Sequence, residues 1–250
     1  MSANRSTSFR SELFLLMVPM LWGFGYPLIR SSMGNIGPLG FLQLRFLIAL
    51  IVLLPGLGKS VFTIDKLLLR RGILTGIILF SAYALLNVGL VYTTTSKAGF
   101  IIGLRVVLVP IVGAAIFRLR AARSSWIAAT VSLAGLGFIF FGEFSFPLHL
   151  NPGDALMVGS ASLFALHVLL IGRYAKHTNY AQLLILQLAT VVCLAFLGAL
   201  LLEPKLLPPS PWDWLRILLA GLFSTALAFW LQNRFQYNSA SDKVAIIFST

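Results

Sequence analysis

The sequence predicts an all-α polytopic membrane protein in which two groups of helices form an inverted repeat. Three observations support this fold class: an apolar composition, a series of uncharged runs of membrane-spanning length, and a similarity between the two halves of the chain. Of the 250 residues, 58% are hydrophobic and only 10% are charged, and the mean hydropathy is +0.93. Because soluble domains carry about a quarter charged residues, this chain has too little polar surface for a water-soluble fold.

The uncharged runs predict where the chain crosses the bilayer, which takes roughly 17–25 residues of helix. Six stretches without Asp, Glu, Lys or Arg have 17 to 25 residues each: residues 13–29, 72–96, 124–142, 155–172, 178–202 and 217–233. Two more, residues 39–57 and 98–117, qualify with one arginine in each. We therefore expect eight spans and the beginning of a ninth near Val244, which is cut off at Thr250.

Positive charge gathers on one side of this predicted topology. With a cytoplasmic N-terminus, 13 Lys and Arg residues fall on the cytoplasmic side and four on the other side. An excess of Lys and Arg in cytoplasmic loops is typical of multi-pass membrane proteins. The net charge of +12 therefore indicates membrane orientation and not nucleic-acid binding. We expect an inner-membrane protein with its N-terminus in the cytoplasm.

An internal repeat relates the two halves of the chain. The stretch "YTTTSKAGFII" at residues 92–102 aligns with "YNSASDKVAII" at residues 237–247, an offset of 145. Offsets of 142 to 145 keep further pairs in order: Trp22 with Phe164, Arg45 with Gln187, Gly76 with Gly221, Tyr83 with Ala228 and Asn87 with Gln232. We expect residues 1–145 to form a first five-span unit and residues 146–250 to form a second, incomplete one.

An odd number of spans in each unit has a functional consequence. The second unit enters the bilayer from the opposite side and is inverted relative to the first. Inverted repeats are typical of secondary transporters, whose substrate site lies near the midplane between the two copies. The topology therefore favours transport by alternating access, and the alternative is a non-transporting membrane enzyme or scaffold. No His/Cys cluster at ligand spacing, buried acid pair or phosphate-binding glycine loop occurs in the sequence, so we expect no cofactor or metal.

Two arginines within the predicted spans are candidate substrate contacts. Arg105 lies about 15 Å from the outer end of its span, near the middle of the bilayer. A charge at this depth usually faces a polar cavity or a partner, although carbonyl groups freed by Pro110 could also bind it. Arg45 is shallower, about 10 Å from the outer end. It can reach the interface or pair with neighbouring carbonyls, or it can contact substrate.

The stretch "LWGFGYPLIR", residues 21–30, places residues that weaken a helix deep in the first span. Trp22 lies about 15 Å from the cytoplasmic end, too deep for the interfacial aromatic belt. Irregular backbone at this depth is tolerated where it faces protein or a water-filled cavity. We therefore expect Trp22, Gly25 and Tyr26 to form a wall of the substrate path. Close packing of the helix against a neighbour is the alternative.

Several neutral polar residues in the spans are further cavity candidates. Tyr83 and Asn87 share one helix face, and Thr225 and Gln232 share the corresponding face of the second unit. Gln187 occupies the position that matches Arg45, and His167 could exchange protons near neutral pH. The alternative for each is a hydrogen bond between helices, worth roughly 0.6 kcal/mol on average.

The positions of the acidic residues indicate the charge of the substrate. All seven lie at span ends or in loops: Glu12, Asp65, Glu143, Asp154, Glu203, Asp213 and Asp242. The charge within the spans is therefore positive, which favours a substrate that carries a carboxylate or a phosphate. We expect a small polar metabolite, most often an amino acid or a related carboxylate. A phosphorylated sugar or a nucleotide derivative is the alternative.

The sequence resembles the EamA family of the drug/metabolite transporter superfamily. The resemblance rests on "LWGFGYPLIR", on "GPLGFLQLRFLIALIVLLP" at residues 37–55, on "LLNVGLVYTTTSKAGFIIGLRVVLVPIVGA" at residues 85–114, and on "LAFWLQNRFQYNSASDKVAII" in the second unit. It implies ten helices, cytoplasmic termini and alternating-access transport of small metabolites, often amino-acid export. It also implies Trp22 and Arg45 as family-like positions. The family expects a Glu-Pro segment in the ninth span and a complete tenth span, so the resemblance implies that this chain is a fragment.

Overall fold

The computed structural model describes residues 2–56, 63–119, 123–142, 151–174, 178–236, 244 and 246–248. Within these residues the regular elements are helices, as the sequence predicts. Seven helical segments of the described chain are long and apolar enough to cross a bilayer: Ser11–Ser32, Pro38–Gly56, Lys66–Tyr92, Thr95–Phe117, Pro152–Tyr174, Tyr180–Leu202 and Pro211–Phe235. They coincide with seven of the eight predicted spans. The other predicted span, residues 124–142, is a helix but is not one of these seven.

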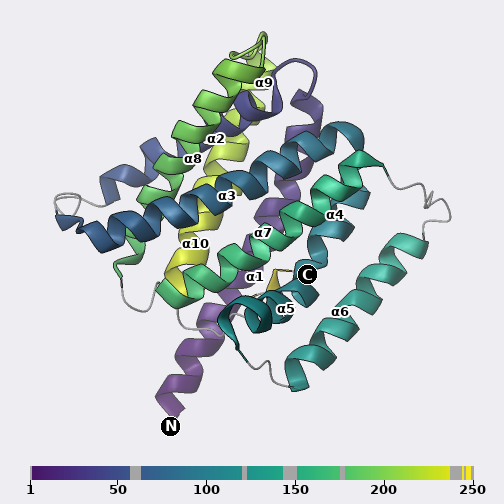
Figure 1. Ribbon diagram of the computed structural model, residues 1–250, viewed down its shortest axis with the longest axis vertical. Helices are drawn as coiled ribbons and strands as arrows, with labels where there is room; N and C mark the ends of the chain where they lie inside the picture. Colours follow the sequence, from purple (N-terminus) through teal and green to yellow (C-terminus); the bar gives the residue numbers. More distant parts are fainter. Residues whose placement is uncertain are drawn as a thin grey trace.

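Figure 1 shows the arrangement of the helices. Their bounds are α1 Ser2–Ser32, α2 Pro38–Leu53, α3 Lys66–Tyr92, α4 Thr95–Gly103, α5 Arg105–Phe117, α6 Arg123–Gly142, α7 Pro152–Tyr174, α8 Tyr180–Leu202, α9 Pro211–Leu219, the π-helix η3 Ala220–Leu227, and α10 Ala228–Phe235. The expected boundary between repeat units, at residue 145, and most of the second repeated motif, including residues 237–243, lie outside the described residues.

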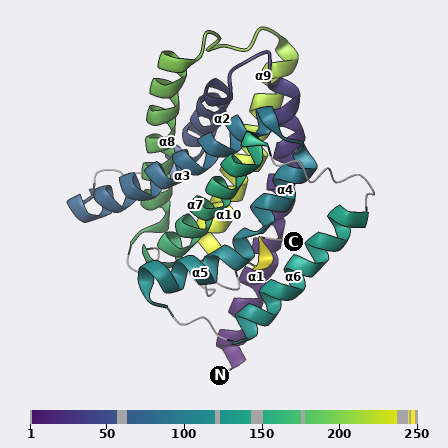
Figure 2. The same cartoon turned by 45° about the vertical axis from the view of Figure 1, so that its right-hand side comes forward.

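Helix α3 lies at the centre of the bundle, where it packs against α7 and α8. Helix α2 packs against α8 and η3, and α1 packs against α10 and η3. Helix α6 lies at the edge beside α4 and α5, as Figures 1 and 2 both show. The main apolar core joins residues from α1, α2, α3, α4, α7, α8 and the α9–α10 segment. The centre of the bundle therefore collects side chains from both halves of the sequence.

Two glycines bring helices of the two halves into close contact. A Cβ atom on Gly76 of α3 would lie 2.5 Å from Cβ of Thr190 in α8. A Cβ atom on Gly221 of η3 would lie 2.9 Å from Cβ of Ile48 in α2. Because both contacts are too short for any side chain, glycine is required where these backbones approach each other.

Helix α2 receives its N-terminal cap from a distant part of the chain. Gly37 precedes the helix and has no side chain to cap it. The Glu203 carboxylate, at the end of α8, accepts hydrogen bonds from the backbone N–H groups of Leu39 at 2.7 Å and Gly40 at 2.8 Å. A carboxylate at a helix N-terminus satisfies orphan N–H donors and complements the helix dipole. This acid, predicted to lie at a span end, therefore joins α2 to α8.

Two of the predicted spans are not regular α-helices. Residues 98–117 are divided at Leu104 between α4 and α5, and α5 turns away from the direction of α4 (Figure 2). Residues 217–233 contain the π-helix η3, in which the Thr225 hydroxyl donates to the Ala220 carbonyl at 3.0 Å. A π-helical turn bonds residues five apart and is often found at functional sites. Uniformly apolar sequence predicts a span but not these local irregularities.

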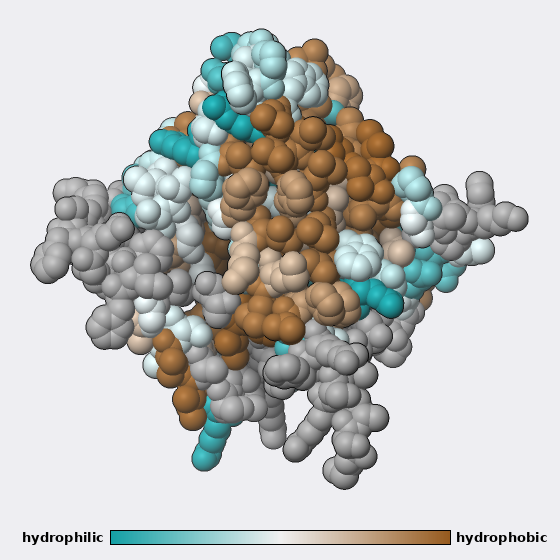
Figure 3. Space-filling model, turned by 180° about the vertical axis from the view of Figure 1, so that it is seen from behind, coloured by the Kyte–Doolittle hydropathy of each residue, from teal (hydrophilic) through white to brown (hydrophobic). Residues whose placement is uncertain are grey.

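The surface of the bundle is suited to lipid. Large apolar side chains are exposed on many helices, among them Met20 on α1, Ile51 on α2, Leu201 on α8 and Trp212 on α9. Figure 3 shows apolar side chains gathered across the middle of one face, with hydrophilic residues toward the top. Exposed apolar area of this extent is typical of a surface that contacts lipid. The chain is therefore a multi-pass membrane protein.

Candidate functional site

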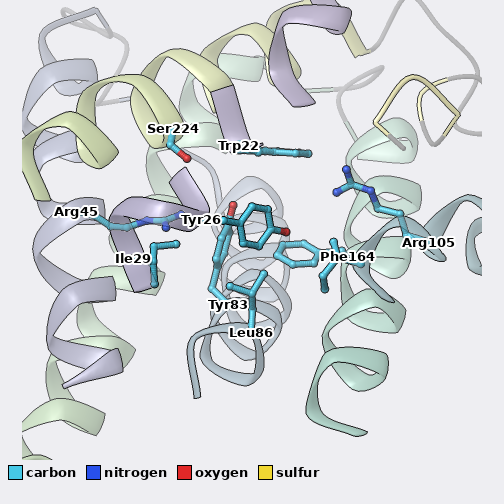
Figure 4. A pocket seen from close by; sticks show the side chains of 10 residues that line it. Trp22, Tyr26, Ile29, Arg45, Tyr83, Leu86, Arg105, Phe164 and Ser224 are labelled. Carbon is cyan, nitrogen blue, oxygen red and sulfur yellow. The ribbon is translucent and has the colours of Figure 1, made fainter. Parts of the chain in front are cut away.

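A cavity lies where α1, α2, α3, α4, α5, α7 and η3 meet. Its lining comprises Trp22, Tyr26, Ile29, Arg45, Tyr83, Leu86, Ile102, Arg105, Phe164 and Ser224. Figure 4 shows Arg45 and Arg105 reaching into it from opposite sides, with the rings of Tyr26, Tyr83 and Phe164 between them. The cavity volume is about 20 Å³. The cavity in this conformation therefore has room for about one water molecule.

Arg45 is held by aromatic rings. Its side chain is 1% exposed, which rules out the predicted reach to the interface. Its Cζ atom lies 4.7 Å from the centre of the Tyr83 ring and 5.2 Å from that of Phe46. The predicted pairing with carbonyl groups is also not observed at its Nε and Nη1 atoms, which have no hydrogen-bond partner among the described residues. Cation–π contacts stabilise the charge and leave these two donors unsatisfied.

Arg105 is the first residue of α5, directly after the break at Leu104. Its Cζ atom lies 4.9 Å from the Trp22 ring and 5.5 Å from the Phe248 ring. One Nη group donates a hydrogen bond to the Phe248 carbonyl. The carbonyl that binds this arginine therefore comes from the segment after α10 and is not one freed by Pro110. The Nε atom of Arg105 has no partner in the described part of the chain.

The buried polar atoms without partners in the cavity wall share one property. They are Nε1 of Trp22, Nε and Nη1 of Arg45, and Nε of Arg105, and all four are hydrogen-bond donors. The described lining residues include no Asp or Glu. A buried donor without a partner is unfavourable by roughly 1–3 kcal/mol, and by more when it is charged. The cavity is therefore suited to a ligand that offers several acceptor oxygens and negative charge.

Aromatic rings form the remaining walls. The Tyr83 ring packs edge-on against Phe164 at 4.9 Å and against Phe46 at 5.2 Å between ring centres. The Trp22 ring meets Phe248 edge-on at 5.0 Å. Such contacts fix the planes of the rings. The arginines therefore lie over rings whose planes are fixed by their neighbours.

Gly25 is outside the lining, although the sequence predicts it in the cavity wall. A Cβ atom at this position would lie 2.3 Å from Oγ of Ser224 in η3. The structure thus favours the alternative of close packing for Gly25, whereas Trp22 and Tyr26 do line the cavity. Helix α1 also continues through Pro27 as a single element.

Two other candidates, His167 and Gln187, form a hydrogen-bonded chain with Asn233 away from the cavity lining. His167 Nε2 lies 2.9 Å from Gln187 Oε1, and Gln187 Nε2 donates to Asn233 Oδ1 at 3.3 Å. Asn233 Nδ2 donates in turn to the Phe229 carbonyl at 3.0 Å. We call His167, Gln187 and Asn233 the amide chain. It joins α7, α8 and α10. This is the alternative given above for His167 and Gln187, a hydrogen bond between helices.

The other polar candidates also bind protein groups. Asn87 Nδ2 donates to the Pro38 carbonyl at 3.0 Å, and Gln232 Nε2 donates to Gln236 Oε1 at 3.0 Å. The side-chain carbonyl oxygens of Asn87 and Gln232 have no partner among the described residues. These two residues and Thr225 are absent from the cavity lining. Of the neutral polar candidates on the two matched faces, Tyr83 alone belongs to that lining.

Five lining residues are absent from the candidates predicted from sequence: Ile29, Leu86, Ile102, Phe164 and Ser224. The sequence could have indicated Phe164, because the internal repeat aligns this residue with Trp22. Ser224 belongs to the π-helix η3, which the sequence does not predict. The three aliphatic residues are indistinguishable in sequence from any other apolar residue of a span.

Comparison with known proteins identifies the family. The model of the EamA-like transporter family matches residues 9–141 and 151–250. A curated relative from Archaeoglobus fulgidus, described as an uncharacterized transporter, is 30% identical over 239 residues, which cover 96% of this chain and 73% of the relative. A solved structure described as "Crystal structure of protein" superposes with a TM-score of 0.77 at 19% identity, covering 96% of this chain and 83% of that chain. That likeness supports the helical fold. This chain belongs to the EamA-like transporter family and is a membrane transporter.

Proposed function

We propose that this transporter exports small metabolites that carry a carboxylate, with amino acids and related carboxylates as the first candidates. The observation that carries this proposal is the set of unpaired donors on Trp22, Arg45 and Arg105 in the cavity wall. A carboxylate offers two acceptor oxygens and one negative charge, and it pairs with a guanidinium in a fork geometry. A cationic substrate would meet two arginines and, among the described lining residues, no acidic group.

A phosphorylated sugar or a nucleotide derivative is the second candidate. A phosphate group also presents acceptor oxygens, and arginine is well suited to bind it. The cavity volume is only about 20 Å³, so its walls must move for any substrate, and the smaller carboxylates require the least movement. A nucleotide would require a much larger rearrangement of the rings than an amino acid would.

Transport by alternating access between two inverted units, residues 1–145 and 146–250, fits the internal contacts. Gly76 of α3 contacts Thr190 of α8, and Gly221 of η3 contacts Ile48 of α2. The repeat offsets relate these two contacts to each other, since residue 76 matches 221 and residue 48 matches 190. The family model also matches the chain in two separate segments. Inverted units of this kind can rock around a central site.

The cavity in this conformation is too narrow for the proposed substrates. Space for about one water molecule excludes an amino acid, so side chains of the wall must move when substrate enters. The α4–α5 segment is suited to this movement, because it is divided at Leu104 directly before Arg105. Arg105 also binds the Phe248 carbonyl, which a substrate carboxylate would have to replace.

Transport assays in proteoliposomes test the proposal. We expect saturable movement of radiolabelled carboxylates and amino acids, with little movement of sugar phosphates or nucleotides. Arg105→Ala should reduce carboxylate transport strongly, because it removes the charge and the unpaired Nε donor. Arg234→Gln is the matched control, since Arg234 is an exposed arginine of α10 outside the cavity. Unchanged carboxylate transport in Arg105→Ala would show that Arg105 does not bind substrate.

The membrane orientation, which is proposed from the distribution of Lys and Arg, can be tested separately. We propose an inner-membrane location with a cytoplasmic N-terminus, which places residues 59–71 and 118–123 on the same, cytoplasmic side. Single cysteines introduced in these two segments should react equally with a membrane-impermeant thiol reagent added from one side. Labelling of the two segments from opposite sides would refute the topology on which the inverted arrangement depends.

A further inference from the structure

The two arginines of the cavity bind separate partners and do not form one cluster. Arg45 comes from α2 and lies over the rings of Tyr83 and Phe46, whereas Arg105 comes from α5 and lies over the rings of Trp22 and Phe248. In Figure 4 their guanidinium groups point inward from opposite sides, and the Tyr26 and Phe164 rings lie between them. In this arrangement each guanidinium group is available to a separate anionic group.

The cation–π contacts and the unpaired atoms indicate which part of each guanidinium is available. A ring against the face of a guanidinium leaves the N–H groups pointing outward in the guanidinium plane, where a carboxylate binds in the fork geometry. The unpaired atoms are of this kind: Nε and Nη1 on Arg45, and Nε on Arg105. At the Arg105 end the Trp22 Nε1 group adds a further unpaired donor. Each end of the cavity therefore has its own donors for an anionic group.

The positive charge of the two arginines is not balanced by the described lining residues. Arg45 and Arg105 are 1% and 6% exposed, and the described lining residues include no acid to neutralise either one. A buried charge is stable only when it is paired and hydrogen-bonded. A ligand with one negative charge would leave one guanidinium without a counter-charge. Two negative charges on one molecule would neutralise both ends.

From this arrangement we propose that the preferred substrate carries two anionic groups, one for each arginine, on a short spacer that lies against the Tyr26 and Phe164 rings. Dicarboxylates and acidic amino acids have this chemistry. The inference rests on the proposed transport of carboxylates and specifies which carboxylates bind best. Arg105, with the Trp22 indole N–H group, binds one anionic group, and Arg45 binds the other.

The test compares ligands that differ in a single anionic group. Equilibrium binding to the purified full chain in nanodiscs is measured for glutarate and its monoamide, and for glutamate and glutamine. Within each pair the size is conserved and one carboxylate is replaced by a carboxamide. We expect the two-carboxylate member of each pair to bind at least tenfold more tightly. Comparison of glutarate with glutamate then shows whether an ammonium group is tolerated.

Variants test whether the preference for a second carboxylate depends on both Arg45 and Arg105. In Arg45→Gln and in Arg105→Gln, we expect the advantage of glutarate over its monoamide to fall below about twofold, because one anionic group loses its partner. Arg234→Gln, which removes a positive charge outside the cavity, should retain the full advantage. Size-exclusion profiles and thermal melting confirm that each variant is folded. The wild-type ligand comparison needs no variant, so a variant that fails to fold does not prevent the test.

The outcomes separate this inference from the proposed function. Equal binding of glutarate and its monoamide to the wild type, or an advantage that survives in Arg45→Gln, would overturn the two-anion inference. If carboxylate transport in proteoliposomes is nevertheless observed, the proposed function stands without it. If no carboxylate binds or moves, both are wrong. A ligand preference that depends on both arginines supports both.

Discussion

The cavity and the amide chain are two buried polar regions of the same bundle, and they differ in how their hydrogen bonds are satisfied. In the amide chain, the side chains of His167, Gln187 and Asn233 bind one another and the Phe229 carbonyl. In the cavity wall, Trp22, Arg45 and Arg105 retain donors without partners in the described structure. Both regions are close to Phe229. The centre of its ring lies 6.0 Å from that of Trp22 and 6.4 Å from that of His167.

This difference distinguishes a structural role from a binding role. A satisfied network joins helices and is complete without a ligand. Unpaired buried donors are unfavourable until a ligand or water binds them, so they mark the place where acceptors are expected. On this reasoning, changes in the cavity should alter ligand affinity more than stability, and changes in the amide chain should do the reverse.

Arg105→Lys should have the largest effect on affinity. Lysine retains the positive charge but loses the planar fork and the Nε donor. Loss of two charge-assisted hydrogen bonds, at about 1.5 kcal/mol each, corresponds to a reduction of about a hundredfold in carboxylate affinity. Equilibrium binding of a radiolabelled dicarboxylate measures it. Affinity within twofold of the wild type would mean that charge alone determines binding at this end of the cavity.

Trp22→Phe should have a smaller effect on affinity. Phenylalanine retains a ring for the Arg105 guanidinium but has no Nε1–H donor. Loss of one hydrogen bond to a charged group, about 1.5 kcal/mol, corresponds to about tenfold weaker binding. The same binding assay measures it. Trp230→Phe on α10, which is exposed and outside the lining, is the control. Equal affinities of the two variants would exclude the Trp22 indole N–H group from the site.

Gln187→Leu should have the smallest effect on affinity and a measurable effect on stability. It removes the group that joins His167 to Asn233 and leaves both side chains without that partner. Interhelical hydrogen bonds of this kind contribute about 0.6 to 2 kcal/mol in membranes. We expect a lower midpoint of thermal unfolding with dicarboxylate affinity within twofold of the wild type. A large loss of affinity with unchanged stability would place Gln187 in the binding site and contradict the comparison.

Five of the candidates predicted from sequence, namely Trp22, Tyr26, Tyr83, Arg45 and Arg105, line one cavity, and their contact with substrate stays a prediction. The signals were the depth of each residue in its span and its polar or amphipathic character. The same reasoning also selected Asn87, His167, Gln187, Thr225 and Gln232, which bind protein groups outside the lining. A polar residue inside a span must find a hydrogen-bond partner, but its spacing does not show whether that partner is another helix or a ligand.

The sequence by itself determined that the chain is an all-α multi-pass membrane protein and that the charge within its spans is positive. Both follow from composition and spacing, since uncharged runs of about 20 residues must be helical in lipid. The tertiary structure decided the rest: that Gly25 is a packing contact with Ser224, that Arg105 lies at a helix break, and that the two arginines occupy opposite sides of one cavity. These features depend on contacts between residues that are distant in the chain, which helical periodicity within single spans does not encode.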